Sequence, residues 1–217
     1  MGAVAAKTKN ARIGTAIVVL PFHNPVQVAE ESATIDIISN GRFSLGVGAG
    51  YQAQEFHGMG VNINDSREMF TEYLDVVMKC WEEGSITYNG EFVNIDDILV
   101  IPKPIQKPGP PVYIAVSTSP ESVDKAASLG LPILVGGPTT TLGQTPAVVK
   151  LWHDRMEYYG RPHENIDLPV SANVYVAPTM EEAENDIKGL EDKINEEFYR
   201  VGNPADKSGK IPENYKH

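Results

Sequence analysis

Two segments of the chain carry side chains that could bind an anionic group such as phosphate. Arg67 lies in the first turn of a helix that Asp65 is expected to cap, and Ser119-Pro120-Glu121-Ser122 opens another helix directly after a strand. Hydroxyls, a guanidinium and the free N–H groups at a helix N-terminus are common phosphate ligands in proteins. These segments therefore predict a phosphate site if the fold brings the two helix starts together.

Each segment also has an interpretation without a ligand. Arg67 can form a surface ion pair with Asp65 or Glu68, and the sequence favours neither interpretation. Ser119 can be an ordinary helix cap followed by proline at the first helical position, which we favour from the residues alone. Glu121 would repel a phosphate if its carboxylate pointed inward.

Two glycine-rich segments follow expected strands, Gly46-Val47-Gly48-Ala49-Gly50 and Gly136-Gly137-Pro138. The first fits a dinucleotide fingerprint poorly, because the third glycine would fall at Tyr51 and the next helix cap is Asp65. It is either a turn that permits tight packing or a loop where the backbone approaches a flat ligand. For the second segment an ordinary turn is the favoured interpretation.

The residues alone assign neither a metal site nor a catalytic group. The histidines are scattered, and none pairs at i, i+4 with another type of metal ligand. They are His23, His57, His153, His163 and His217. His23 and Glu55 are the candidates for catalysis, although for both, as for His57, a solvated loop residue is the favoured interpretation. The single cysteine, Cys80, falls on an apolar helix face and predicts inert packing.

The composition is that of a globular protein without a nucleic-acid or membrane partner. The chain has 217 residues, 41% of them hydrophobic and 22% charged, with a formal net charge of -11. Nucleic acids and anionic membranes would repel that charge, and no apolar run reaches the roughly 18 residues of a membrane span. One cysteine and an N-terminus without a signal-peptide core fit a cytoplasmic protein.

The expected elements alternate between strands and helices, which favours a parallel sheet. The expected strands are 13–20, 42–47, 112–116, 132–135 and 168–177, and the expected helices are 26–39, 65–81, 119–129, 146–159 and 179–199. Residues 51–64 look irregular, a β-hairpin with Asn89-Gly90 as its turn is inserted at 86–95, and a polar tail covers 202–217.

Five strands are too few for an eight-stranded barrel, which needs about 250 residues. The sheet is therefore either open or a segment of a barrel. In a parallel barrel the strand carboxyl ends share one rim, and the candidate residues Gly48, Arg67, Ser119 and Gly136 all follow such ends.

An ordered series of segments lies between Ala5 and about Glu184: Ile13-Gly14-Thr15-Ala16-Ile17-Val18-Val19-Leu20-Pro21, His23-Asn24-Pro25-Val26, Ala29-Glu30, Ser39-Asn40-Gly41-Arg42, Leu45-Gly46-Val47-Gly48, Glu55-Phe56, Gly60, Arg67, Glu72, the linker from Pro104 to Pro111, Ser119-Pro120-Glu121-Ser122, and Ala126-Ala127 to Gly130. In these segments the chain resembles the bacterial luciferase-like flavin monooxygenase family.

The resemblance implies an eight-stranded α/β barrel that binds reduced FMN, or in some relatives a deazaflavin, at the rim. Members activate dioxygen at the flavin and oxygenate an aldehyde, sulfonate, alkane or similar compound. Ala16 and Ile17 would then lie against the flavin ring, and the resemblance allows a cis peptide bond between them. The other implied contacts are the ring and ribityl chain for Gly48, Gly50 and Tyr51, the phosphate for Arg67, Ser119 and Ser122, and the far side of the ring for Gly136 and Gly137.

The same resemblance implies a partial (β/α)8 barrel, and we expect it to form one domain over 1–217. The first two strands and the eighth are missing, and with them a histidine that some members use in catalysis. Gly48 and Ala49 stand where some relatives carry cysteine and arginine, so light emission does not follow from the resemblance. We expect such a chain to fold poorly alone or to pair with another chain.

From the resemblance we expect a flavin-dependent monooxygenase that is supplied by a flavin reductase and forms a dimer. Its substrates would be dioxygen and a small organic molecule. The alternatives are a non-catalytic flavin-binding protein or partner subunit and a deazaflavin-dependent oxidoreductase. An enzyme outside the family that uses a phosphorylated substrate at the same rim is a third possibility.

Overall fold

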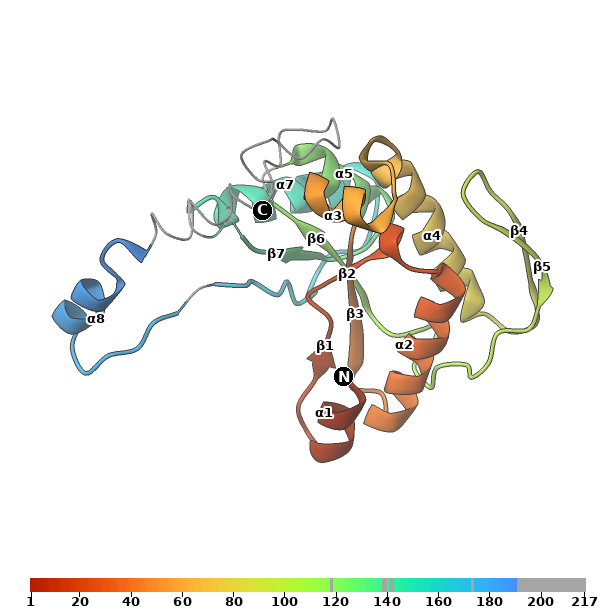
Figure 1. Ribbon diagram of the computed structural model, residues 1–217, viewed down its shortest axis with the longest axis horizontal. Coiled ribbons are helices and arrows are strands. Elements are labelled where there is room, and N and C mark those ends of the chain that lie inside the picture. The colour runs from red at the N-terminus through yellow and green to blue at the C-terminus, as the bar shows by residue number, and fades with distance from the viewer. Residues whose placement is uncertain (118, 138–139, 141–142, 173, 191–217) are drawn as a thin grey trace. The chain divides into compact units, whose positions relative to one another are not determined.

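The computed structural model contains one parallel sheet of five strands, with β3 (Phe43–Gly48) at its centre (Figure 1). On one side β3 pairs with β1 (Ile13–Gly14) and then with β2 (Val18–Val19). On the other side it pairs with β6 (Val112–Val116), which pairs in turn with β7 (Ile133–Val135). Because every pairing is parallel, the strand carboxyl ends lie at one edge of the sheet.

The structure describes residues 1–117, 119–137, 140, 143–172 and 174–190. They fall into two units, and we describe each by itself. The first unit contains Met1–Ala49 and Glu68–Ala172 and holds the sheet. The second contains Gly50–Arg67 and the described residues after Ala172. The expected tail at 202–217 lies outside the described residues, and the single domain over 1–217 stays a prediction.

Helices follow the strands and bury apolar side chains in the core of the first unit. They are α2 (Pro25–Ser39), α4 (Ser66–Cys80), α5 (Pro120–Ser128) and α7 (Thr145–Tyr158), and a short α1 (Gly2–Lys7) precedes β1. Leu74 of α4, Val123 of α5 and Trp152 of α7 are at most 1% exposed. Each such side chain stabilises the fold by about 1.5–3 kcal/mol through burial.

The helix boundaries follow the capping residues that the sequence offers. The Asn24 side chain accepts hydrogen bonds from Val26 N at 2.9 Å and Gln27 N at 3.4 Å and starts α2. Asn40 adopts a left-handed conformation with φ of 54° and ends it. Ser119 accepts from Ser122 N at 3.4 Å and starts α5. These three boundary predictions are confirmed, as is the strand at 112–116.

The single strand expected at 13–20 is wrong, because β1 and β2 are separated by Thr15–Ile17 and followed by a 3-10 turn at Leu20–Phe22. In the gap the hydroxyl of Thr15 donates to Gly46 O and accepts from Gly46 N, both at 2.9 Å. A side chain thus replaces the strand-to-strand bonds at this point. The peptide bond between Ala16 and Ile17 is cis, as the family resemblance allowed.

The irregular segment expected at 51–64 is also wrong. It contains α3 (Ala53–Met59), which ends at Gly60 with φ of 69°, and a 3-10 turn at Ile63–Asp65. Ala53 and Phe56 supply its buried face, at 4% and 1% exposure. With only two buried positions in seven residues, the helical period is too short to detect in the sequence.

The hairpin exists as β4 (Ile86–Asn89) and β5 (Asn94–Ile98), but its turn is longer than expected. Asn89 pairs with Asn94, so four residues rather than two connect the strands. The carboxylate of Glu72 on α4 accepts hydrogen bonds from the N–H groups of Glu91, Phe92 and Val93 at 2.8–2.9 Å. This contact from a distant helix sets the loop length, and a local turn signal cannot reveal it.

The strand expected at 168–177 does not form over the part of that range that the structure describes. Val170 makes one isolated parallel bridge to Val135, and Val174 and Val176 are 80% and 84% exposed. Val174 and Val176 therefore do not pack against a neighbouring strand within the described residues. The next helix, α8 (Met180–Ile187), starts at the predicted cap Thr179 and ends at Ile187, whereas 191–199 of the predicted helix lie outside the described residues.

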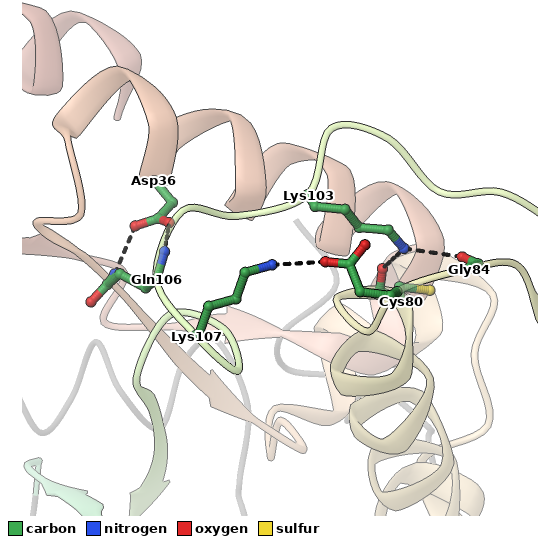
Figure 2. A network of polar contacts seen from close by, with 7 residues as sticks. Asp36, Cys80, Gly84, Lys103, Gln106 and Lys107 are labelled. Carbon is green, nitrogen blue, oxygen red and sulfur yellow. Dashed lines mark hydrogen bonds and ion pairs between the residues drawn. The ribbon is translucent and has the colours of Figure 1, made fainter.

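The proline-rich linker joins the N-terminal ends of the sheet to α2 and α4 through polar contacts (Figure 2). The buried carboxylate of Asp36 accepts from Gln106 N at 3.0 Å and Gln106 Nε2 at 2.7 Å. Lys103 Nζ donates to the carbonyl of Cys80 at the end of α4 and to that of Gly84 after it. Asp36 is fully buried on α2, whereas the neighbouring Ile37 is 42% exposed.

The first unit is an α/β half-barrel: a parallel sheet with helices following its strands and a hairpin inserted before β6. The predicted fold class is therefore confirmed. Within the described part of the chain, no helix has the length and apolar character that a membrane crossing requires.

Candidate functional site

The carboxyl edge of the sheet gathers most of the candidate residues of the first unit. Gly48 ends β3, Ser119 follows β6 by three residues, and Gly136 follows β7 directly. Parallel α/β sheets bind ligands at this edge, because the loops after the strands converge there. The structure thus brings Gly48, Ser119 and Gly136 to one edge.

The two glycines of β3 make room for the segment Thr15–Ile17. A Cβ atom on Gly46 would collide with the Thr15 carbonyl oxygen, and one on Gly48 would collide with Cδ1 of Ile17. The same Cβ on Gly48 would lie 3.7 Å from the Ala115 Cβ. On the Cβ side these glycines therefore permit tight packing, which was one of the two open interpretations. The contact of Gly48 with a flat ligand stays a prediction.

The N-terminus of α5 carries two hydroxyls and one carboxylate. Ser122 Oγ donates to Ser119 Oγ at 3.3 Å, and Ser119 Oγ donates to Glu121 Oε2 at 2.6 Å. Both serines are half-buried, while Glu121 is exposed. The two hydroxyls suit a phosphate. Pro120 has no N–H, and Ser122 N and Val123 N already donate to Ser119. The Glu121 carboxylate competes with a phosphate for the Ser119 hydroxyl.

Gly136 and Gly137 lie after β7 with different surroundings. A Cβ on Gly136 would lie 3.2 Å from the Ser171 Cβ, so Gly136 allows the chain at residue 171 to approach. Gly137 has φ of 60° and no atom within 4 Å of its would-be Cβ. Space therefore exists beside Gly137, while Pro138 of the predicted motif lies outside the described residues.

Gly50, Tyr51 and Arg67 belong to the second unit. Tyr51 and Arg67 are exposed there, and Gly50 has φ of 78°. Arg67 lies in the first turn of α4, as expected. The roles assigned to these three residues at a cofactor stay predictions.

The candidates for catalysis lie on the surface. His23 follows the 3-10 turn after β2, and Glu55 and His57 lie on α3, all of them exposed. Cys80 is buried at 1% exposure, and burial raises the pKa of its thiol to about 11. Since the thiolate is the nucleophilic form, Cys80 does not serve as a nucleophile at neutral pH. The inert packing predicted for it is confirmed.

Thr15 is the residue at this edge that the sequence interpretation missed. Its hydroxyl makes two hydrogen bonds to Gly46 inside the sheet. The available signal was its chemistry, since Thr15 is the one polar side chain between Ile13 and Leu20. The hydroxyl of the half-buried Thr15 finds its partner in the backbone of the neighbouring strand β3.

A family model described as luciferase-like monooxygenase matches residues 1–216. The chain is 34% identical over 134 residues to the oxygenase component of flavin-dependent trigonelline monooxygenase from Acinetobacter baylyi, which covers 61% of this chain and 37% of that protein.

Among solved structures, the monooxygenase RslO1 from Streptomyces bottropensis superposes with a TM-score of 0.81 at 25% identity, covering 93% of this chain and 61% of that one. The oxygenating constituent of 3,6-diketocamphane monooxygenase from Pseudomonas putida, in complex with FMN, superposes with a TM-score of 0.76 at 19% identity and shares the fold, covering 92% of this chain and 60% of that one.

The chain spans between 33% and 56% of the length of three curated relatives that it matches. The parallel half-barrel, the residues gathered at its carboxyl edge and the match over residues 1–216 agree with one another. This chain belongs to the luciferase-like monooxygenase family.

Proposed function

We propose that this chain forms the flavin site of a monooxygenase that uses reduced flavin and dioxygen to oxygenate a small organic substrate. The observation that carries the proposal is the carboxyl edge of the sheet. There the α5 N-terminus, with Ser119 and Ser122, lies at the same end of the sheet as the close-packed segment of Thr15–Ile17 and Gly48. A phosphate-tailed planar cofactor needs a polar anchor and an apolar wall of this kind.

The described residues fit a flavin mononucleotide in chemistry. The hydroxyls of Ser119 and Ser122 would hold the phosphate. Ala16 and Ile17 would form an apolar wall for the ring, with Gly48, Gly136 and Gly137 beside it. The roles of Arg67, Gly50 and Tyr51 at the flavin rest on the family resemblance alone.

Bound reduced flavin supplies the electrons with which dioxygen is activated. The chain contributes binding, orientation and exclusion of water. The apolar side chain of Ile17 and the buried strand ends exclude water from the ring side of the site. The serine hydroxyls would orient the phosphate, and thereby the whole cofactor, relative to that wall.

The relative from Acinetobacter baylyi is an oxygenase component, which supports a flavin reductase as the partner that delivers the cofactor. We further propose a dimer, because the sheet is a half-barrel whose two edges would be covered by another chain or by further strands. We also propose a cytoplasmic location, which the single cysteine fits. A binding assay with both cofactors distinguishes FMN from a deazaflavin.

The experiment is a fluorescence titration of the natural protein that carries this chain, at its full length, with FMN and with a deazaflavin. Tight binding of FMN, followed by oxygen uptake when a flavin reductase, NADH and candidate substrates are added, is the expected result. The Arg67→Ala variant should bind the preferred flavin more weakly. Binding without oxygen uptake would favour a non-catalytic flavin protein, and no affinity for either flavin would contradict the proposal.

A further inference from the structure

The segment between β1 and β2 contains one residue more than the strand beside it. Gly14 pairs with Ser44 and Val18 pairs with Val47, so Thr15–Ile17 lie opposite only Leu45 and Gly46. An extra residue in one strand interrupts the ladder and moves that strand away from its partner. The position of the displaced segment then depends on whatever replaces the lost backbone bonds.

The Thr15 hydroxyl replaces them. Leu45 N donates to Pro111 O on the opposite side of β3, so the N–H and C=O of Gly46 face the interrupted side. The Thr15 hydroxyl accepts from that N–H and donates to that C=O, with both distances at 2.9 Å. Gly46 is buried, and buried backbone groups without partners are strongly unfavourable.

The neighbouring residues leave the segment little freedom on the sheet side. The Thr15 carbonyl oxygen fills the space where a Cβ of Gly46 would be, and Cδ1 of Ile17 fills the space of a Gly48 Cβ. The segment is therefore held by the two bonds of the Thr15 hydroxyl, by a bond from Thr15 N to Ser44 O at 3.4 Å, and by close contact with two glycines. Its apolar residues Ala16 and Ile17 lie next to the carboxyl end of β3.

We propose that Thr15 is a positioning residue that fixes the wall of Ala16 and Ile17 against which the flavin ring packs. This inference rests on the proposed function. Thr15 itself need not touch the cofactor. Its two hydrogen bonds set the distance of Ala16 and Ile17 from β3. That distance decides whether a flavin can pack its ring on the wall while its phosphate binds at α5.

The test compares Thr15→Val with Thr15→Ser in the natural protein at its full length. Valine has the shape of threonine without the hydroxyl, whereas serine keeps both hydrogen bonds. We expect Thr15→Ser to bind FMN and riboflavin with nearly unchanged affinity. We expect Thr15→Val to bind both more weakly by about tenfold, the lower end of the loss seen when residues that orient metal ligands are replaced.

Riboflavin has no phosphate, so its affinity distinguishes a change at the wall from a change at the phosphate anchor. Loss of the wall weakens FMN and riboflavin by the same factor and shifts the absorption spectrum of the bound ring, whereas Ser122→Ala weakens FMN alone. A stabilising role without positioning would lower the melting temperature of Thr15→Val but leave the flavin affinities and the spectrum as in the wild type, and that result would overturn the inference.

Two further outcomes are decisive. If Thr15→Val does not fold, Thr15→Cys replaces it, because a thiol is a weak donor and acceptor of similar size. Flavin affinity of Thr15→Cys equal to that of Thr15→Ser would overturn the inference, and weaker binding would support it. A wild-type protein that binds no flavin would overturn the proposed function together with this inference, whereas wild-type binding with an unaffected Thr15→Val overturns this inference alone.

Discussion

The hydroxyl of Ser119 donates a hydrogen bond of 2.6 Å to the Glu121 carboxylate at the N-terminus of α5. A phosphate bound at this helix start would have to replace Glu121 as the acceptor. The acidic residue therefore tunes the affinity of the proposed anchor, because it offers the serine a partner when no phosphate is present.

Replacing Glu121 with glutamine should strengthen FMN binding by about fivefold, because two unit charges about 4 Å apart in water repel by about 1 kcal/mol. Riboflavin, which has no phosphate, should bind with unchanged affinity. Fluorescence titration at low salt measures both. Glu164→Gln, an exposed site with the same change of charge, is the matched control and should leave both affinities unchanged. Weaker FMN binding in Glu121→Gln would show that the carboxylate assists the cofactor.

The contact of Asp36 with Gln106 predicts a loss of stability on Gln106→Ala (Figure 2). The variant loses the Nε2 donor to the fully buried carboxylate, and a hydrogen bond to a charged group contributes about 1.5–3 kcal/mol. Urea denaturation should show a decrease in unfolding free energy of that size.

Lys107→Ala is the matched control in the same linker. Its ion pair with Glu83 joins side chains that are 60% and 83% exposed, and such pairs contribute about 0–1 kcal/mol. In the double variant Asp36→Ala with Gln106→Ala, the combined loss should be smaller than the sum of the single losses, because the two residues are in direct contact. Additive losses would contradict the coupling.

Glu72 should hold the hairpin loop in place. Glu72→Ala removes the acceptor for three N–H groups, so amide hydrogen exchange at Glu91, Phe92 and Val93 should accelerate while the sheet amides of β3 remain protected. Glu72→Gln, which keeps one oxygen acceptor, should show an intermediate rate. Glu82→Ala, at an exposed position after the same helix, is the control. Unchanged exchange in Glu72→Ala would mean that the loop is held by its own turn.

Cys80 predicts a pH dependence of stability at alkaline pH. Burial raises the pKa of its thiol from an ordinary value of 9.0 to about 11 in the folded state. Between these values the unfolded chain loses the proton while the folded chain keeps it, so this contribution is fully present below pH 9 and is lost as the pH rises toward 11. Urea denaturation of wild type and Cys80→Ala at several pH values measures it, and a steeper decline in the wild type is expected. Parallel curves would show that the thiol does not contribute.

Local signals in the sequence predicted the elements whose ends depend on one or two neighbouring residues. Asn24 and Ser119 cap their helices because the acceptor and the N–H groups lie within three residues of each other. The strand at 112–116 is apolar on both faces and flanked by proline and serine, so its limits were visible.

The features that were missed depend on residues far apart in the chain. Thr15 divides a strand by bonding to Gly46, and Glu72 sets the length of a loop about twenty residues later. The buried position of Asp36 depends on Gln106, seventy residues away. No local pattern can contain such contacts. For the candidate site, the residues were found in the sequence because they follow the carboxyl ends of expected parallel strands. Their roles came from the family resemblance.

The most direct test of the proposed phosphate anchor at α5 is the ratio of FMN to riboflavin affinity in Ser122→Ala, measured in the natural protein at its full length. Ser122 is preferred to Ser119, because Ser119 also caps the helix. We predict that FMN affinity falls by about tenfold or more, the cost of one hydrogen bond to a charged group, while riboflavin affinity is unchanged. Equal FMN affinity in wild type and Ser122→Ala would contradict the proposed anchor.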